Sequence, residues 1–231
     1  MSSGLSRFAV AGLAGLAALV LMFGSYDGDD GKDSDATDEE KASSRSAARS
    51  GVLDRDRTRK LLPPRDALKG WTPVGGPTAE DVTSAPGFVC SSRAAPVCGD
   101  AVAYGKALYA KANSGRITFT VYAYKSATAA TSAYPHMWKD GHAELRPPLT
   151  NARLSGETGQ QHNARRGKYP FMTAPGAIVQ LRVGTTLLLI ESGGADARRL
   201  SDARLSDLAT MFVKRSQQAQ KGEKPSAKVA G

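Results

Sequence analysis

The chain of 231 residues contains only two cysteines and three histidines, and aromatic residues make up 6% of it. Two cysteines are too few for a disulfide-rich scaffold or for a four-cysteine zinc site. The sequence also lacks a G-x-S-x-G nucleophile motif, a Walker P-loop and a G-x-G-x-x-G motif between a strand and a helix. We therefore expect neither catalytic activity nor a cofactor.

Polar and charged side chains are absent from residues 8–23, which read FAVAGLAGLAALVLMF. With the three residues that follow, this run is nearly long enough to cross a bilayer as a helix. Arg7 is the only charge before the run, and the positive-inside rule, which counts Lys and Arg in the short flank, predicts a cytoplasmic N-terminus. Acids dominate the residues after the run. We expect residues 1–26 to form a cytoplasmic stub and a single-pass anchor in the cell membrane, with the C-terminal domain outside.

Cleavage of the apolar run as a signal peptide is the alternative, and it would make the protein secreted. Signal peptidase prefers small residues three positions and one position before the cut. For cuts after Ser25 or Gly24, the third position holds Phe23 or Met22. Ser25 also stands where a lipoprotein would carry its lipidated cysteine, so these residues favour an uncleaved anchor.

Residues 27–60 predict a disordered, charged linker. Eight acids and one base lie in 27–40, and Val52 and Leu53 are the main large apolar residues of the linker. The net charge of the whole chain is +9, so the positive charge belongs to the residues beyond the acidic run. We expect a domain over 61–222 and a flexible tail over 223–231.

The pattern of residues 61–222 predicts an α+β fold with an antiparallel sheet built from two hairpins. Apolar and polar residues alternate over 116–125, which pairs with 101–110. The second hairpin joins 177–183 to 186–191 across a short turn.

Helices are expected to pack on this sheet. Ser126 caps a helix that Pro135 must kink or end, and the apolar residues of 201–216 recur at helical spacing. A short helix over 65–69 precedes a loop over 72–86, and the stretch between the two hairpins reads as irregular.

Cys90 and Cys98 flank a segment with the proline and serine of a turn. Thiols oxidise outside the cytoplasm, and a strand-loop-strand brings their Cα atoms within bridging distance. We therefore expect a structural disulfide bond between them.

Two groups of residues are candidate ligand sites. The first is a basic cluster beside glycines, in what reads as a loop; it suits an anionic envelope component, and its alternative is a solvated surface. The second is a set of tyrosines on the strands, which form either a groove or part of the core. The candidates are His162, Arg165, Arg166 and Lys168 for the cluster, and Tyr122 and Tyr124, with Tyr104, Tyr109 and Trp138, for the groove.

Metal binding and hydrolysis are the chemical alternatives. His136, His142 and Glu144 match no metal-binding spacing, so no metal site is expected. A cell-wall hydrolase would need acids that meet in a cleft, and the acids to inspect are Glu144, Glu157 and Glu191.

Four segments carry a family resemblance, and they read LLPPRDALKGW, ITFTVYAYKSATAATSAY, LRVGTTLLLIESGG and VKRSQQAQKGEKP. The order of elements resembles secreted or membrane-anchored proteins of actinobacteria with a sensor-like domain, similar to the extracytoplasmic domain of one class of receptor serine/threonine kinases. The resemblance implies an antiparallel sheet flanked by helices and a ligand cleft. That kinase domain has two disulfides, whereas this chain has one cysteine pair and no kinase domain.

These observations together predict a non-enzymatic, membrane-anchored extracytoplasmic domain. It binds an envelope ligand or a protein partner, and nucleic acid is not an expected partner because the predicted compartment contains little of it. A structural or partner-docking protein without a small ligand is the alternative, and a hydrolase is the third hypothesis.

Overall fold

The structure is a computed structural model. It describes residues 51–82, 95–111, 115–142, 145–169, 174–194 and 200–229. The chain divides into two units, Met1–Asp38 and Glu39–Gly231, and all these residues belong to the second. The helices are α2 (Arg55–Leu61), the 3-10 helix η1 (Arg65–Ala67), α3 (Ala95–Cys98), α4 (Ala127–His142) and α5 (Asp202–Gln220). The strands are β1 (Thr72–Pro73), β2 (Thr78–Asp81), β3 (Ala101–Lys111), β4 (Gly115–Tyr124), β5 (Arg146–Asn151), β6 (Gln161–Lys168), β7 (Pro175–Val183) and β8 (Thr186–Gly193).

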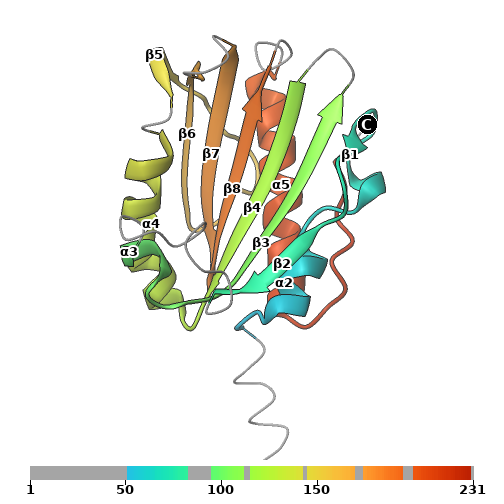
Figure 1. Ribbon diagram of the computed structural model, residues 1–231, viewed down its shortest axis with the longest axis vertical. Coiled ribbons are helices and arrows are strands. Elements are labelled where there is room, and N and C mark those ends of the chain that lie inside the picture. The colour runs from blue at the N-terminus through green and yellow to red at the C-terminus, as the bar shows by residue number, and fades with distance from the viewer. Residues whose placement is uncertain are drawn as a thin grey trace, which may run out of the picture. The chain divides into compact units, whose positions relative to one another are not determined.

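One antiparallel sheet of eight strands carries the fold (Figure 1). Its order is β1-β3-β4-β8-β7-β6-β5, and β2 pairs with β3 beside β1. The two predicted hairpins, β3–β4 and β7–β8, are confirmed, and the pairing of β4 with β8 joins them. The α+β class and the antiparallel sheet are therefore as expected.

Side-chain alternation on the central strands separates two hydrophobic clusters. On β4, Phe119 and Val121 belong to the larger cluster with α5, whereas Tyr124 belongs to the smaller cluster with α4. On β8, the neighbours Leu188 and Leu187 divide in the same way. Because successive side chains of a strand point to opposite faces, α5 and α4 cover opposite faces of the sheet.

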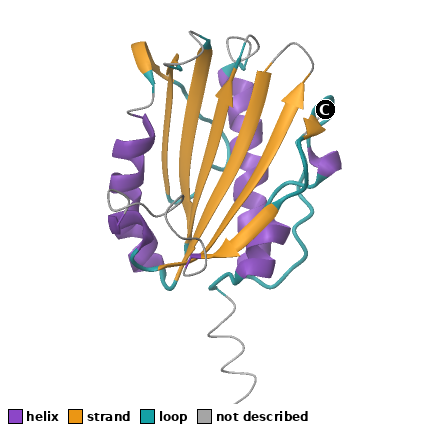
Figure 2. Cartoon of the chain, in the orientation of Figure 1, coloured by secondary structure: helices purple, strands orange, loops and turns teal. Residues whose placement is uncertain are grey.

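The long helix α5 packs along one face of the sheet, against β7 and β8, and lies behind the sheet in the view of Figure 2. The ring of Phe212 meets that of Phe119 edge-on, with 5.3 Å between centroids. Ser201 caps the helix by accepting a hydrogen bond from the N–H of Arg204, as helix N-termini require. The predicted helix over 201–216 is thus confirmed and extends to Gln220.

Helix α4 runs through Pro135 and ends only at His142. Proline removes one backbone donor from a helix and leaves the carbonyl of the preceding turn without its usual partner. Pro135 and Thr131 are both exposed, so water can solvate that carbonyl. The expectation that Pro135 ends this helix was wrong, and a kink is the alternative that stays open.

The stretch expected to be irregular contains strands β5 and β6. Residues of β6 are mostly polar, so they carry no hydrophobic alternation, and their order comes from backbone pairing with β7. On β5, Pro147 and Pro148 lack N–H donors, and the pairing with β6 shifts register between Arg146 and Thr150.

Both predicted boundaries of the domain differ from the structure. Leu53 is fully buried and α2 begins at Arg55, so part of the expected linker is packed on the domain. Val229 is also buried, and its N–H donates to the carbonyl of Ala67, so the expected tail is docked. The apolar residues 8–23 lie outside the described residues, within which no helix has the length and apolar character needed to cross a membrane.

Arg215 joins α5, α2 and the C-terminal segment. Only 2% of this residue is exposed, and its guanidinium donates to the carbonyls of Lys60, Leu61 and Leu62 at 2.7 to 3.1 Å. A fourth hydrogen bond, of 3.2 Å, reaches the carbonyl of Ala227. The last carbonyls of a helix have no partner within it, and here the guanidinium supplies one.

Two prolines explain why α2 needs this arginine. Most helices end with backbone N–H groups that fold back onto the last carbonyls. Pro63 and Pro64 have no N–H, so the chain after α2 lacks those donors. The hydroxyl of Tyr109 lies within hydrogen-bond distance of the carbonyls of both prolines. Two side chains from distant elements therefore lie within hydrogen-bond distance of five successive carbonyls.

We predict that Arg215→Met destabilises the domain by about 3 kcal/mol or more, because buried carbonyls lose charge-assisted donors. Arg215→Lys keeps the charge but has fewer donors. Its free energy of unfolding should therefore lie between those of Arg215→Met and the wild type. Urea unfolding followed by circular dichroism measures the change. The neighbour Lys214 is exposed, so Lys214→Met is the matched control. Equal midpoints for Arg215→Met and the control would contradict this role for the arginine.

Candidate functional site

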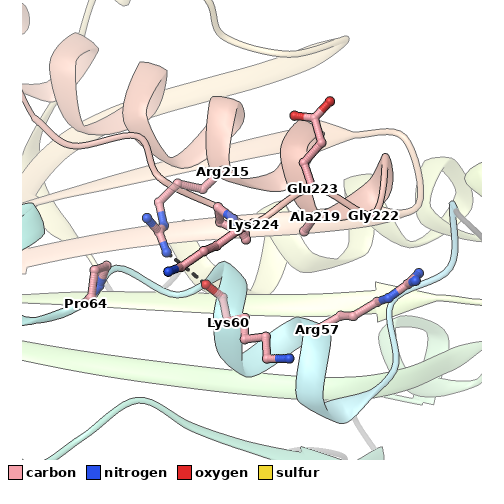
Figure 3. A pocket seen from close by; sticks show the side chains of 9 residues that line it. Arg57, Lys60, Pro64, Arg215, Ala219, Gly222, Glu223 and Lys224 are labelled. Carbon is pink, nitrogen blue, oxygen red and sulfur yellow. Dashed lines mark hydrogen bonds between the residues drawn. The ribbon is translucent and has the colours of Figure 1, made fainter.

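A groove of about 580 Å³ lies between α2, the end of α5 and the segment that follows α5 (Figure 3). This volume is within the range of small-molecule sites. The lining residues are Arg57, Lys60, Pro64, Arg215, Ala219, Gly222, Glu223, Lys224 and Pro225. Four of them are basic and one is acidic, so the groove carries a net formal charge of +3.

The α2 wall of the groove presents Arg57 and Lys60. Residues three apart on a helix lie on the same side, which explains why both side chains reach the groove. Asp54 caps α2 by accepting a hydrogen bond of 2.8 Å from the backbone N–H of Arg57. The buried side chains of Thr58 and Leu61 hold the helix on the domain.

Gly222 turns the chain back toward α2 to make the other wall. The glycine has a φ of 78°, and the N–H groups of Gly222 and Glu223 donate to the carbonyls of Ala219 and Gln218. This is the hydrogen-bond pattern of a Schellman motif, which favours glycine at the left-handed position. The chain then runs past the groove with Lys224 and Pro225 on its wall.

Residues 223–229, hereafter the C-terminal strap, are held at three further points. Arg215 binds the carbonyl of Ala227, and Lys228 forms an ion pair with Asp66. The N–H of Val229 donates to the carbonyl of Ala67 at 3.1 Å. The wall made by the strap is therefore a fixed part of the domain.

Arg215 lines the groove, and among the described residues no carboxylate accepts a hydrogen bond from it, although Asp66 lies close enough to interact with its charge. All four of its hydrogen bonds go to neutral backbone carbonyls. Burial lowers the pKa of Arg215 to about 10, which keeps the guanidinium protonated at neutral pH. The groove is therefore permanently positive.

The four residues of the predicted basic cluster lie on β6, and the expectation of a loop was wrong. Arg165 lies 5.8 Å from the ring centroid of Trp138 on α4. Arg166 turns to the other face, where it donates to Asp202 and to the carbonyl of Leu200 at 2.6 Å. Strand alternation thus separates the two arginines.

The other two members of that cluster are exposed to solvent. His162 has its Nδ1 3.0 Å from the hydroxyl of Thr158 and is exposed, as is Lys168 at the end of the strand. Because Arg165 lies on the other face, the four residues do not converge on one site, and their role in binding stays a prediction.

The predicted tyrosine groove is only partly assembled. Tyr104 and Tyr122 are neighbours, with ring centroids 5.1 Å apart, and burial raises the pKa of both. Tyr124 is buried in the small cluster under α4, and Tyr109 lies in the larger cluster on the opposite face. Core packing therefore explains the positions of Tyr124 and Tyr109, and only Tyr104 and Tyr122 remain as candidates for a groove.

Glu157 and Glu191, two of the three acids considered for hydrolysis, do not lie together. The carboxylate of Glu157 accepts from the side chain of Gln217 on α5. Glu191 lies near Tyr104 and Tyr122, since its charge contributes to their raised pKa values. These two acids are on opposite faces of the sheet, and Glu144 lies outside the described residues.

The structure describes only some of the residues considered for metal binding and for the disulfide bond. No three His, Cys, Asp or Glu side chains in the described ranges are arranged to hold a metal ion. His136 is exposed on α4. Cys98 is buried and no described cysteine is free, but Cys90 lies outside the described residues, so their pairing stays a prediction.

Sequence reasoning missed the groove because its walls come from the predicted linker and the predicted tail. Arg57 and Lys60 are in a seven-residue helix with four bases, which resembles a charged linker in composition. Two signals were available: Leu53 before α2, and Val229 as a large apolar residue in a polar tail. Each is buried in the structure.

No family model and no curated protein matches this sequence. Among solved structures, the chain is similar to the extracellular domain of PknH from Mycobacterium tuberculosis, with a TM-score of 0.43 and 10% sequence identity. The likeness covers 68% of this chain and 97% of that chain. What the groove binds therefore has to be inferred from its own side chains.

We predict that Asp66 titrates below its ordinary pKa of 3.8, chiefly because Lys228 donates a hydrogen bond to the carboxylate. A lowered pKa in the folded state contributes stability above the ordinary pKa, and this contribution disappears as the pH falls through the lowered value. Carbon-13 NMR titration of Asp66 should show an upward shift of its pKa in Lys228→Ala. Lys221→Ala, at another exposed lysine after α5, should leave it unchanged; equal pKa values in all three proteins would exclude the ion pair.

Proposed function

We propose that the chain is a non-enzymatic, sensor-like domain, held outside the cytoplasm by its N-terminal apolar segment, that binds an anionic envelope ligand in the basic groove. The observation that carries the proposal is the net charge of +3 around a hollow of about 580 Å³. A partner-docking protein without a ligand would need no such hollow. A hydrolase would need paired acids, and Glu157 and Glu191 lie on opposite faces of the sheet.

The charge supports binding of an anion over other ligands. Positive side chains around a partly enclosed site concentrate anions and strengthen their hydrogen bonds. Arg57 and Lys60 form no ion pair with a described carboxylate, so their donors are free for a ligand. A location outside the cytoplasm is supported by Arg7, which precedes the apolar run of residues 8–23.

We predict that citrate raises the thermal unfolding midpoint of the full chain above that in sodium chloride of equal ionic strength, because a ligand of the native state stabilises it. Differential scanning calorimetry in neutral detergent measures the shift. The double variant Arg57→Gln/Lys60→Gln should lose it.

The control double variant is Lys106→Gln/Arg116→Gln, which removes two exposed bases from the sheet and changes the net charge equally. This control should retain the citrate shift. If both double variants respond like the wild type, the stabilisation comes from the overall charge and the groove is not the site.

We predict that protease added to intact bacterial cells that express the full chain removes residues 51–229. Three substitutions after the apolar run, Asp27→Lys, Asp29→Lys and Asp30→Lys, should reverse the charge bias and increase protection. Immunoblotting against the C-terminus follows the result, with a cytoplasmic protein as the lysis control. A fully protected wild-type domain would refute the external location.

A further inference from the structure

Within the proposed function, and resting on it, we infer that the groove recognises an organic phosphate ester. The charge is the first reason. The lining contains one acid, Glu223, and four bases, which are Arg57, Lys60, Arg215 and Lys224. A ligand that neutralises the site therefore carries two or three negative charges. A phosphate monoester has a charge of about −1.5 to −2 at neutral pH, whereas a simple carboxylate has −1.

The orientation of Glu223 leaves this charge uncompensated. In Figure 3 its carboxylate points away from Arg57 and Lys60, which extend from α2 on the other side of the groove. Its side chain is exposed to solvent. The one acid of the lining is thus poorly placed to neutralise the α2 wall.

The donors come from more than one direction. Arg57 and Lys60 belong to α2, and Lys224 belongs to the C-terminal strap across the groove. A tetrahedral phosphate offers three acceptor oxygens in different directions, whereas the two oxygens of a carboxylate lie in one plane. The two-walled arrangement therefore suits phosphate better than carboxylate.

Arg215 contributes to the electrostatic field in the groove more than to direct hydrogen bonds with a ligand. Four of the five N–H donors of an arginine are used on carbonyls here, so at most one remains for a ligand. Its charge nevertheless stays close to the groove and is only weakly screened, because the residue is buried.

The apolar residues of the lining favour a ligand that has an organic part beside its phosphate. Pro64, Ala219 and Pro225 contribute apolar surface between the charged side chains. A bare phosphate ion would occupy only a small part of about 580 Å³. A phosphate ester with a glycerol or sugar portion places its charge on the bases and its carbon atoms against the prolines.

Isothermal titration calorimetry of the full chain in phosphatidylcholine nanodiscs tests the inference at constant ionic strength. Glycerol 3-phosphate should bind about tenfold more tightly than succinate, which has similar charge on two carboxylates. Arg57→Gln/Lys60→Gln and Lys224→Gln should each weaken glycerol 3-phosphate about tenfold or more. Lys106→Gln/Arg116→Gln should stay within about twofold of the wild type. Unfolding midpoints show that each variant remains folded.

Nanodiscs that contain phosphatidic acid, whose headgroup is a phosphate monoester, distinguish the two sources of the phosphate ester. If a lipid headgroup occupies the groove, added glycerol 3-phosphate should no longer bind in these discs. If the ligand is a soluble ester, its affinity should be unchanged. Either result supports phosphate recognition.

Two results would overturn the inference. If succinate or citrate binds as tightly as glycerol 3-phosphate, the groove recognises anions without preference for phosphate, and the proposed function stands alone. If no anion binds, the proposed function fails as well.

Discussion

A buried guanidinium that binds carbonyls in place of a carboxylate is the constraint on which this domain depends. Pro63 and Pro64 deprive the end of α2 of backbone donors, and Arg215 of α5 replaces them. A buried arginine is costly unless its donors are satisfied. Here the cost is offset because the same side chain joins α2, α5 and the strap, three segments that are far apart in the sequence.

The candidate site is a by-product of that arrangement. Arg215 donates its hydrogen bonds to neutral carbonyls, so no hydrogen-bonded carboxylate neutralises it, and the charges of Arg57, Lys60 and Lys224 add to its own. The strap supplies one wall only because Gly222 reverses the chain and Ala67 anchors Val229. Stability and binding therefore share a residue, and substitutions at Arg215 would change both.

Local patterns predicted the centre of the fold but not the site. The hairpins were predictable because residues such as Ile117 and Phe119 alternate with polar neighbours over a whole strand. Helix α2 has seven mostly charged residues, and its order depends on Leu53 and Leu61 packing against distant elements. Strand β6 has no apolar period, and its pairing with β7 provides its order. Contacts between residues far apart in the sequence leave no periodic pattern, and single apolar residues such as Leu53 and Val229 are weak signals. The two walls of the groove were therefore predicted to be a linker and a tail.

The edge strand β5 limits how this protein can associate. An unpaired strand at the margin of a sheet usually exposes a row of donors and acceptors that can template a strand of another molecule. Pro147 and Pro148 remove two successive donors from β5, and only a short part of it pairs regularly with β6. At high protein concentration, the β5 edge therefore does not favour pairing with the sheet edge of another copy, which limits aggregation through this edge.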